Sequence, residues 1–267
     1  MLSPEVMRYY QGGGERDRLA CGSGRLEFLR TWDILGRVLP EAPAAVLDVG
    51  GAMGVYAWPL AEAGYQVHVV DPVGEHVVGA AALPGVTAEV GDARDLPAAG
   101  GSADAVLLLG PLYHLLDRPD RVGAWREAAR VLRPGGVVVA ATITRFASLL
   151  DGFVKGYHRD PRFRSMVERA LAGGVHRNDA DEVGWFTSAY FHHPDEIPAE
   201  VSDGGLVLRR VVAVEGPLWM SGPRLEEILA DGQQTGVLLD MLRRVETERS
   251  LLGASSHLIV IAGPNSD

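Results

Sequence analysis

The sequence predicts an α/β protein built on a parallel β-sheet with helices on both faces, a doubly wound arrangement. Short apolar segments alternate with helix-like segments from about residue 45 to residue 143, which is the pattern of repeated βαβ units. Aspartates stand in or directly after the first three apolar segments, and glycines cluster after the first. Because ligands of such sheets bind beyond the carboxyl ends of the strands, these residues also indicate a binding site.

The expected strands and helices follow one another regularly up to residue 143. A helix starting at Asp117 has Trp125 on its apolar face, and "RPGG" is expected to end it before the next strand begins. Two further strands flank a helix expected near residues 224–248. The expected strands are "AAVLDVG" (44–50), "YQVHVVD" (65–71), "VTAEVGD" (86–92), "ADAVLLLG" (103–110), "GGVVVAATI" (135–143), "LVLRRVVAVEG" (206–216) and "SHLIVIAGP" (256–264).

One domain is expected to span the chain, because no linker or repeat interrupts the pattern. Helix-like sequence before the first strand indicates a helical N-terminal cap, and the irregular stretch after the fifth strand indicates a lid or substrate insertion. The expected parts are the cap (1–43), the core (44–143), the insertion (144–193) and the segment that completes the sheet (194–267).

Composition narrows the classes of function. The 267 residues are 47% hydrophobic and carry a formal net charge of −10, which argues against nucleic-acid binding because phosphate contacts need clustered basic residues. No apolar run reaches the roughly 18 residues of a membrane span, and the N-terminus lacks the apolar run of a signal peptide. We therefore expect a cytoplasmic protein. Cys21 is the single cysteine, and no metal site is expected.

The loop after the first strand predicts a cofactor site. Small residues there let the backbone approach a ligand closely, although a tight turn without a ligand would need them too. Asp48, Gly50, Ala52 and Gly54 fit the D/E-x-G-x-G-x-G pattern of S-adenosylmethionine sites. Val55 occupies the place of the third glycine in a dinucleotide motif. The spacing favours the methyl donor, and Gly51 belongs to the same loop.

The next two strand ends extend this site. Asp71, followed by Pro72, ends the second strand about 20 residues on, where a carboxylate accepts hydrogen bonds from ribose hydroxyls. Asp92, followed by Ala93, ends the third strand and is suitably placed for an adenine amino group. The alternative for each aspartate is a helix cap or a turn former.

With these motifs, and with "LLLGPLYHLLD" and "VLRPGG", the chain resembles the class I S-adenosylmethionine-dependent methyltransferases of the small-molecule type. The resemblance implies a Rossmann-like seven-stranded sheet whose last strand, "HLIVIAGP", is antiparallel. It implies S-adenosylmethionine as cofactor and S-adenosylhomocysteine as product. Asp48 and the backbone of Gly50 to Gly54 would face the methionine part, Asp71 the ribose, Asp92 and Ala93 the adenine, and Leu109 and Gly110 the transfer side. Ala52 departs from the family, which more often has glycine there.

Two histidines are candidate catalytic bases. His114 follows the fourth strand and His193 ends the insertion, and imidazole is the usual base near neutral pH. The alternatives are a hydrogen bond that shapes the loop at His114 and a helix cap at His193. Arg18 and Arg30 are candidates to bind a carboxylate, with an ion pair to a neighbouring glutamate as the alternative. Candidate substrate-binding aromatics are Tyr9, Tyr10, Tyr113, Tyr190 and Phe191.

The expected function is methyl transfer from S-adenosylmethionine to an N or O atom of a small molecule. A non-catalytic protein that binds the cofactor and a peptide methyltransferase are the alternatives. A nicotinamide-dependent oxidoreductase is disfavoured by Val55 and by the lack of a Tyr-x-x-x-Lys pair. Specificity depends on the cap and insertion, whose side chains a sequence does not position, so the acceptor and the oligomeric state stay open.

Overall fold

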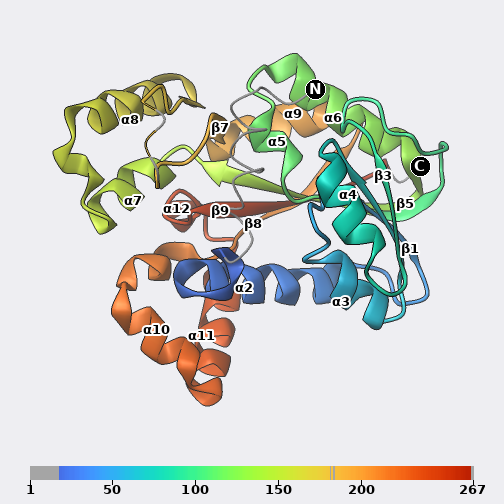
Figure 1. Cartoon of the computed structure of the whole chain (residues 1–267), viewed down its shortest axis with the longest axis horizontal. Coiled ribbons are helices and arrows are strands. Elements are labelled where there is room, and N and C mark those ends of the chain that lie inside the picture. The colour runs from blue at the N-terminus through green and yellow to red at the C-terminus, as the bar shows by residue number, and fades with distance from the viewer. Residues whose placement is uncertain (1–17, 181, 183, 266–267) are drawn as a thin grey trace.

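A computed structural model describes residues 18–180, 182 and 184–265. A twisted sheet runs through the middle of the molecule (Figure 1), with the strand order β3-β2-β1-β4-β5-β9-β8. The first five strands are parallel, and β9 is antiparallel to both β5 and β8. The strands are Ala45–Val49 (β1), Gln66–Asp71 (β2), Val86–Val90 (β3), Ala103–Leu108 (β4), Leu132–Thr144 (β5), Val207–Ala213 (β8) and His257–Gly263 (β9). The predicted fold class and antiparallel last strand are confirmed.

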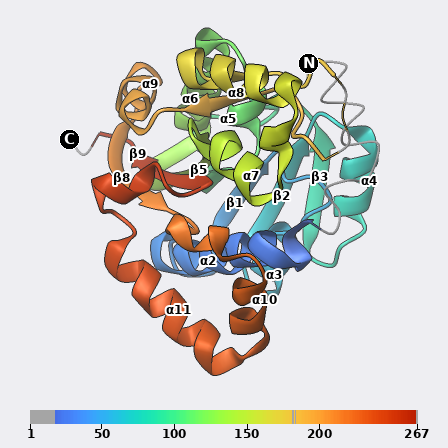
Figure 2. The same ribbon diagram turned by 90° about the vertical axis from the view of Figure 1, so that its left-hand side faces the viewer.

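Helices cover both faces of the sheet. Figure 2 shows α2 and α3 below the strands, and α5, α6 and α9 above them. The helices on the first face are Gly22–Val38 (α2), Ala57–Glu62 (α3) and Gly74–Ala81 (α4); those on the second are Pro111–His114 (α5), Arg118–Val131 (α6) and Ile197–Asp203 (α9). In the part of the chain that the structure describes, no helix combines the length and apolar character needed to cross a membrane.

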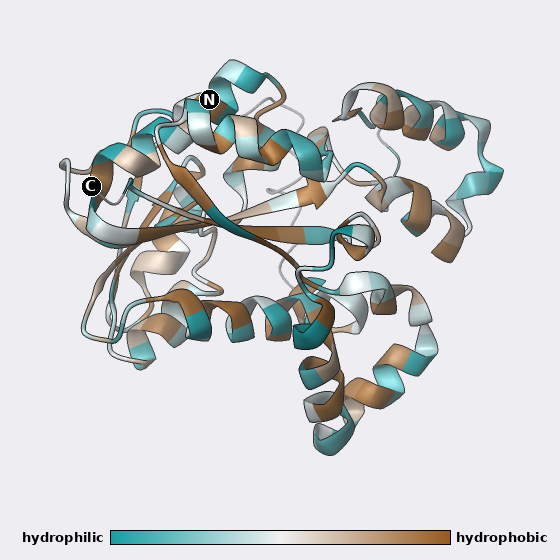
Figure 3. Cartoon of the chain, turned by 180° about the vertical axis from the view of Figure 1, so that it is seen from behind, coloured by the Kyte–Doolittle hydropathy of each residue, from teal (hydrophilic) through white to brown (hydrophobic). Residues whose placement is uncertain are grey.

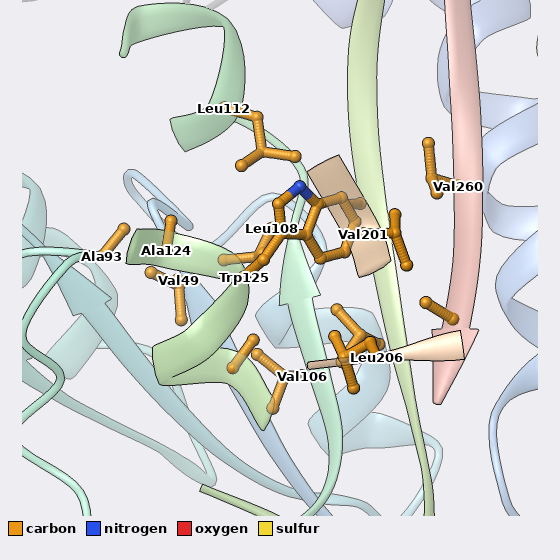
Figure 4. Packing of buried hydrophobic residues seen from close by; sticks show 14 of the residues in the cluster. Val49, Ala93, Val106, Leu108, Leu112, Ala124, Trp125, Val201, Leu206 and Val260 are labelled. Carbon is orange, nitrogen blue, oxygen red and sulfur yellow. The ribbon is translucent and has the colours of Figure 1, made fainter. Parts of the chain in front are cut away.

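The core consists of apolar side chains packed between the sheet and these helices. Trp125 of α6 is 1% exposed and packs among side chains from β1, β4, β9 and α9 (Figure 4). Figure 3 shows the apolar residues concentrated along the strands, as expected for strands that are buried on both faces. This packing fixes the strand ends from which the cavity described below is built.

The segment between β5 and β8 contains helices and two short strands. Its elements are Ala147–Val154 (α7), Tyr157–Arg159 (η2), Pro161–Gly173 (α8), Val175–His176 (β6), Ala189–His192 (β7) and Pro194–Glu196 (η3). β7 pairs in parallel with the last residues of β5, where Ile143 lies beside Phe191. The sequence did not predict β6 or β7, because runs of two and four residues carry too little periodicity.

Two predicted boundaries are wrong. "RPGG" does not separate α6 from β5, because the strand begins at Leu132 and accommodates these residues as a bulge: Ala103 pairs with Leu132 and Ala105 with Val137. The helix expected near 224–248 is two helices, Pro223–Ala230 (α10) and Gly232–Val245 (α11), because the Asp231 side chain caps the second. Arg18–Ala20 (η1), Gly216–Ser221 (η4) and Arg249–Leu252 (α12) complete the described elements.

Candidate functional site

A cavity lies at the edge of the sheet where the parallel strands end. Successive strand ends supply Asp48, Asp71 and Asp92, and β9, which runs the other way, supplies His257. One helix, α2, adds Glu27 and Thr31. Of the sequence-predicted residues, those that line this cavity are Arg18, Asp48, Gly50, Gly51, Ala52, Asp71, Pro72, Asp92, Ala93, Leu109, Gly110, Tyr113 and His114.

The loop after β1 needs small residues because larger side chains would clash with neighbouring atoms. A Cβ on Gly50, whose φ is +70°, would lie 2.9 Å from the ring of Pro111, and a Cβ on Gly51 would lie 2.5 Å from Oδ2 of Asp48. Ala52 has a φ of +47° and is the only non-glycine residue with positive φ in the described part of the chain. The glycine preference at this family position is therefore explained by a left-handed backbone.

Asp48 is a buried carboxylate that faces this loop. It is 1% exposed, and its Oδ2 has no hydrogen-bond partner among the described residues. Burial, with a smaller contribution from the charge of Asp71, raises the pKa of Asp48 to about 7. A cationic group bound in the cavity would meet an uncompensated acceptor here.

Asp71 connects the first and second strand ends. Its Oδ2 accepts the backbone N–H of Ala52 at 3.0 Å, and its Oδ1 accepts that of Val73 at 2.9 Å. Nδ1 of His76 lies 3.0 Å from the same Oδ1. Each carboxylate oxygen has two acceptor sites, so Oδ2 keeps one for a ligand while Oδ1 is fully used. A second ligand hydroxyl at Asp71 would therefore compete with Val73 and His76 for Oδ1.

Asp92 is held by its neighbour Arg94. The Arg94 backbone N–H and Nε both donate to Oδ1 at 2.9 Å, and Nη2 donates to Oδ2 at 2.7 Å. These hydrogen bonds outweigh burial and hold the pKa of Asp92 well below its usual range. Arg94 also binds Asp120, so the wall of the cavity at the third strand end is an ion-paired network.

Aromatic residues form the wall beyond β4. The hydroxyl of Tyr113 donates to the carbonyl of Leu109 at 3.3 Å, and its ring meets His114 edge-on with centroids 4.7 Å apart. Phe186, from the insertion, packs against both rings at 6.2 and 6.1 Å. The insertion thus supports this wall, as expected for a substrate region.

Several predicted site residues are not brought to the cavity. His193 caps η3 by accepting the backbone N–H of Asp195, and its side chain is 41% exposed, which supports the cap rather than the base. Tyr190 lies under the guanidinium of Arg121, 3.6 Å from its ring centroid, and Phe191 stacks on His176. Gly54 packs against Leu83. Tyr9 and Tyr10 lie outside the described residues.

The two candidate arginines form ion pairs. Arg18 binds Glu27 at the cavity wall, while Arg30 is fully buried and binds Asp33 and Glu246 away from it. Sequence reasoning missed several cavity residues that come from flanking elements. These are Glu27, Thr31, Tyr56, His76, Arg94 and His257. For His257 a signal existed: the first residue of an antiparallel strand lies at the edge where parallel strands end.

Known proteins resemble this chain. Residues 46–136 match the family model described as a methyltransferase domain. An uncharacterized methyltransferase of Mycobacterium tuberculosis is 44% identical over 100 residues, covering 37% of this chain and 40% of that protein. A ubiquinone biosynthesis O-methyltransferase of Xanthomonas oryzae pv. oryzae is 35% identical over 169 residues, covering 59% of this chain and 66% of that protein. An S-adenosylmethionine dependent methyltransferase from Mesorhizobium loti has the same fold, with a TM-score of 0.58 at 19% identity, covering 87% of this chain and 97% of that chain.

The chain belongs to the class I S-adenosylmethionine-dependent methyltransferases. The predicted resemblance is confirmed, and S-adenosylmethionine is the cofactor of this family. The chain aligns with only 40% of the length of its mycobacterial relative, and the aligned family model ends before the insertion. The family model thus covers the cavity residues from Asp48 to His114 but not those that come from α2 and β9.

Proposed function

We propose that this protein transfers a methyl group from S-adenosylmethionine to an N or O atom of a small molecule. The observation that carries the proposal is the convergence of Asp48, Asp71 and Asp92 on one cavity. Each lies at the end of a different strand of the sheet. The loop after β1 has small residues that let its backbone approach a ligand closely. Membership of the methyltransferase family supports the same conclusion.

The side chains present fit the donor. Asp71 keeps an acceptor site on Oδ2, which we assign to a ribose hydroxyl. Asp92 and Ala93 line the same cavity at the next strand end, and we assign them to the adenine. The unpartnered Oδ2 of Asp48 suits the ammonium group of the methionine part. When bound, the donor supplies an electrophilic methyl group on a sulfonium.

The remaining wall suits a small acceptor. Leu109, Gly110, Tyr113 and His114 line the cavity beyond β4, and Phe186 closes the space behind the two rings. Such a wall orients the acceptor and excludes water, which are the main requirements of an in-line displacement. The O-methyltransferase named for ubiquinone biosynthesis among the relatives supports a small-molecule acceptor.

Calorimetry with purified protein tests the donor half of the proposal. We expect micromolar binding of S-adenosylhomocysteine and much weaker binding of NAD, because Val55 replaces the third dinucleotide glycine. Binding of NAD without binding of S-adenosylhomocysteine would refute the assignment.

An acceptor screen tests the transfer half. The protein is incubated with S-adenosylmethionine and panels of phenols, catechols, carboxylic acids, amines and short peptides, and methylated products are detected by mass spectrometry. A product whose mass rises by one methyl group supports the enzyme. Tight donor binding with no product from any panel, including short peptides, would instead favour the non-catalytic binding protein.

A further inference from the structure

His257 lies where the cavity meets the antiparallel strand. It is the first residue of β9, which lies between β5 and β8, and it lines the cavity. β9 is separated from β1, whose end carries Asp48, by β4 and β5. Neighbouring strands are about 4.8 Å apart, so His257 lies roughly 14 Å across the sheet from the end of β1, on the side away from Asp71. It therefore faces the acceptor end.

A buried carboxylate fixes the orientation of this ring. Nδ1 of His257 lies 2.6 Å from Oε1 of Glu215, and the backbone N–H of His257 donates to Oε2 at 3.0 Å. Ser255 also donates to Oε2, at 2.8 Å, and its Oγ accepts the backbone N–H of Glu215 at 3.1 Å. Glu215 is 1% exposed. The carboxylate thus has little freedom to turn away from the imidazole.

This geometry selects a tautomer. With a carboxylate at 2.6 Å, Nδ1 carries the proton and donates it to Glu215, so the neutral ring has its lone pair on Nε2. Nε2 has no hydrogen-bond partner among the residues that the structure describes. A histidine whose Nδ1 is held by a buried carboxylate, and whose Nε2 is available to a ligand, has the arrangement of a general base.

A metal ion is the competing explanation. Glu27, Glu215 and His257 present possible ligand atoms within 4.8 Å of one another. However, Glu215 already accepts hydrogen bonds from Ser255 and His257, and both oxygens of Glu27 bind Arg18. Because these carboxylates are already occupied by protein donors, the geometry favours proton transfer over metal binding.

We propose that His257 is the catalytic base for a hydroxyl acceptor and that Glu215 is its positioning residue. The inference rests on the proposed function and narrows its acceptor class. The acceptor oxygen forms a bond to the methyl carbon while the carbon–sulfur bond breaks. The electron pair of the broken bond stays on sulfur, so the sulfonium becomes a neutral thioether. The hydroxyl proton passes to Nε2 of His257, and the imidazolium later releases it to solvent. No further reactant is needed.

The charges around the ring support this role. Burial lowers the pKa of His257, but the nearby carboxylates of Glu27 and Glu215 outweigh it, so the pKa is raised above its ordinary value of 6.5. Arg18, paired with Glu27, opposes them more weakly. A raised pKa makes the neutral ring a stronger base, and the turnover rate should rise with pH through that pKa.

Histidine ring NMR tests the inference on the intact protein with S-adenosylhomocysteine bound. In the neutral state at about pH 9, we expect the nitrogen shifts of His257 to report a proton on Nδ1, with a pKa above 6.5 on titration. Glu215→Gln should lower that pKa by about one unit or more. A neutral ring protonated on Nε2, or a pKa at or below 6.5 in the wild type, would overturn the proposal even if Glu215→Gln fails to fold.

Kinetics with the first hydroxyl acceptor from the screen give the second readout. His257→Asn should lower kcat about 10²- to 10⁴-fold and abolish the acid-side fall of the pH profile, with KM little changed. His68→Asn is the matched control, because His68 also pairs with a glutamate, Glu89, at 2.9 Å, but outside the cavity. An unchanged kcat and pH profile in His257→Asn would refute the base role. Failure of the wild-type protein to bind S-adenosylhomocysteine would instead refute the proposed function.

Discussion

The backbone N–H of Ala52 donates a hydrogen bond to Oδ2 of Asp71 at 3.0 Å, so one side chain joins the loop after β1 to the end of β2. The oxygen that organises the loop is thus also the one that retains an acceptor site for a ribose hydroxyl. Under the proposed function, loop shape and donor binding are coupled through this carboxylate. Substitutions at either residue should therefore separate conformational strain from ligand contact.

Ala52→Gly should stabilise the protein by about 0.5 to 1 kcal/mol, because a left-handed alanine costs more than the extra unfolded-state entropy of glycine. The loop conformation, with a φ of +47° at this position, should be retained, and S-adenosylhomocysteine affinity should change less than about twofold. Thermal and urea unfolding measure the first effect, and calorimetry the second. Ala63→Gly is the control, because Ala63 has a φ of −78° and its replacement should destabilise. A less stable Ala52→Gly protein would contradict the strain argument.

Asp71→Ala should weaken S-adenosylhomocysteine binding by about 1 to 3 kcal/mol, the range for a hydrogen bond to a charged group. The substitution removes the proposed ribose acceptor and also the hydrogen-bond partner of the Ala52 backbone N–H. Calorimetry on the folded variant measures the change. Asp104→Ala is the control: Asp104 likewise accepts a backbone N–H, from Ala45 at 2.8 Å, but does not line the cavity. Equal affinities for wild type and Asp71→Ala would remove Asp71 from the site.

Asp48→Asn should raise stability above pH 7 and weaken donor binding. The pKa of Asp48 is raised to about 7 in the folded protein, against an ordinary value of about 3.9 in the unfolded chain. The unfolded state therefore releases the proton first, so wild-type stability falls as pH rises from about 4 to 7 and stays lowered above that range. Asparagine avoids this loss, which is on the order of 1 to 4 kcal/mol.

Urea unfolding at several pH values tests this sign. The two proteins should converge near pH 4 and differ most at pH 8. Binding of a cationic ligand group to Asp48 should also release a proton near neutral pH, because an opposite charge lowers the pKa of a carboxyl. Calorimetry of S-adenosylhomocysteine in buffers of different ionisation enthalpy detects that proton in the wild type and should find less of it in Asp48→Asn. A stability gain that is independent of pH would point to packing instead.

The convergence of the candidate cofactor residues on one cavity was predictable because these residues occupy strand ends. Asp48 and Asp71 lie at the ends of β1 and β2, and Asp92 lies just after β3. Because parallel strands end at a common edge, their order along the chain predicts that these residues lie near one another. The loop glycines were predictable for the same reason. What the pattern did not reveal was how these carboxylates are already engaged, as Asp92 is by Arg94, because such pairs depend on rotamers.

The acceptor half was less predictable. Glu215 and His257 are 42 residues apart and meet because β8 and β9 pair in antiparallel register, with Ala213 beside Leu258. Local sequence periodicity does not reveal such a pairing. Tyr190 was expected in an aromatic pocket, but the guanidinium of Arg121 covers its ring. His193 follows a strand that is only four residues long, and its ring is used to start a helical turn. Residue type alone did not distinguish residues that line the cavity from residues that cap helices or take part in other side-chain contacts.

Replacing His193 or His114, the two bases predicted from the sequence, should therefore not have the effect on kcat and on its pH profile that is expected for a base. The two replacements should also differ from each other. His193→Ala should cost about 0.5 to 1 kcal/mol of stability through the lost cap, with donor affinity and turnover rate unchanged, because the ring accepts a hydrogen bond from the backbone N–H of Asp195.

His114→Ala should lower kcat about tenfold or less, because His114 packs against Tyr113 in the cavity wall and its loss disturbs acceptor alignment. Neither variant should remove the acid-side limb of the kcat profile that we assign to His257. Unfolding curves, calorimetry and kcat against pH, measured for both variants with one hydroxyl acceptor, provide the comparison. A fall of about 10²-fold or more in kcat with loss of the acid limb in His114→Ala would transfer the base role from His257 to His114.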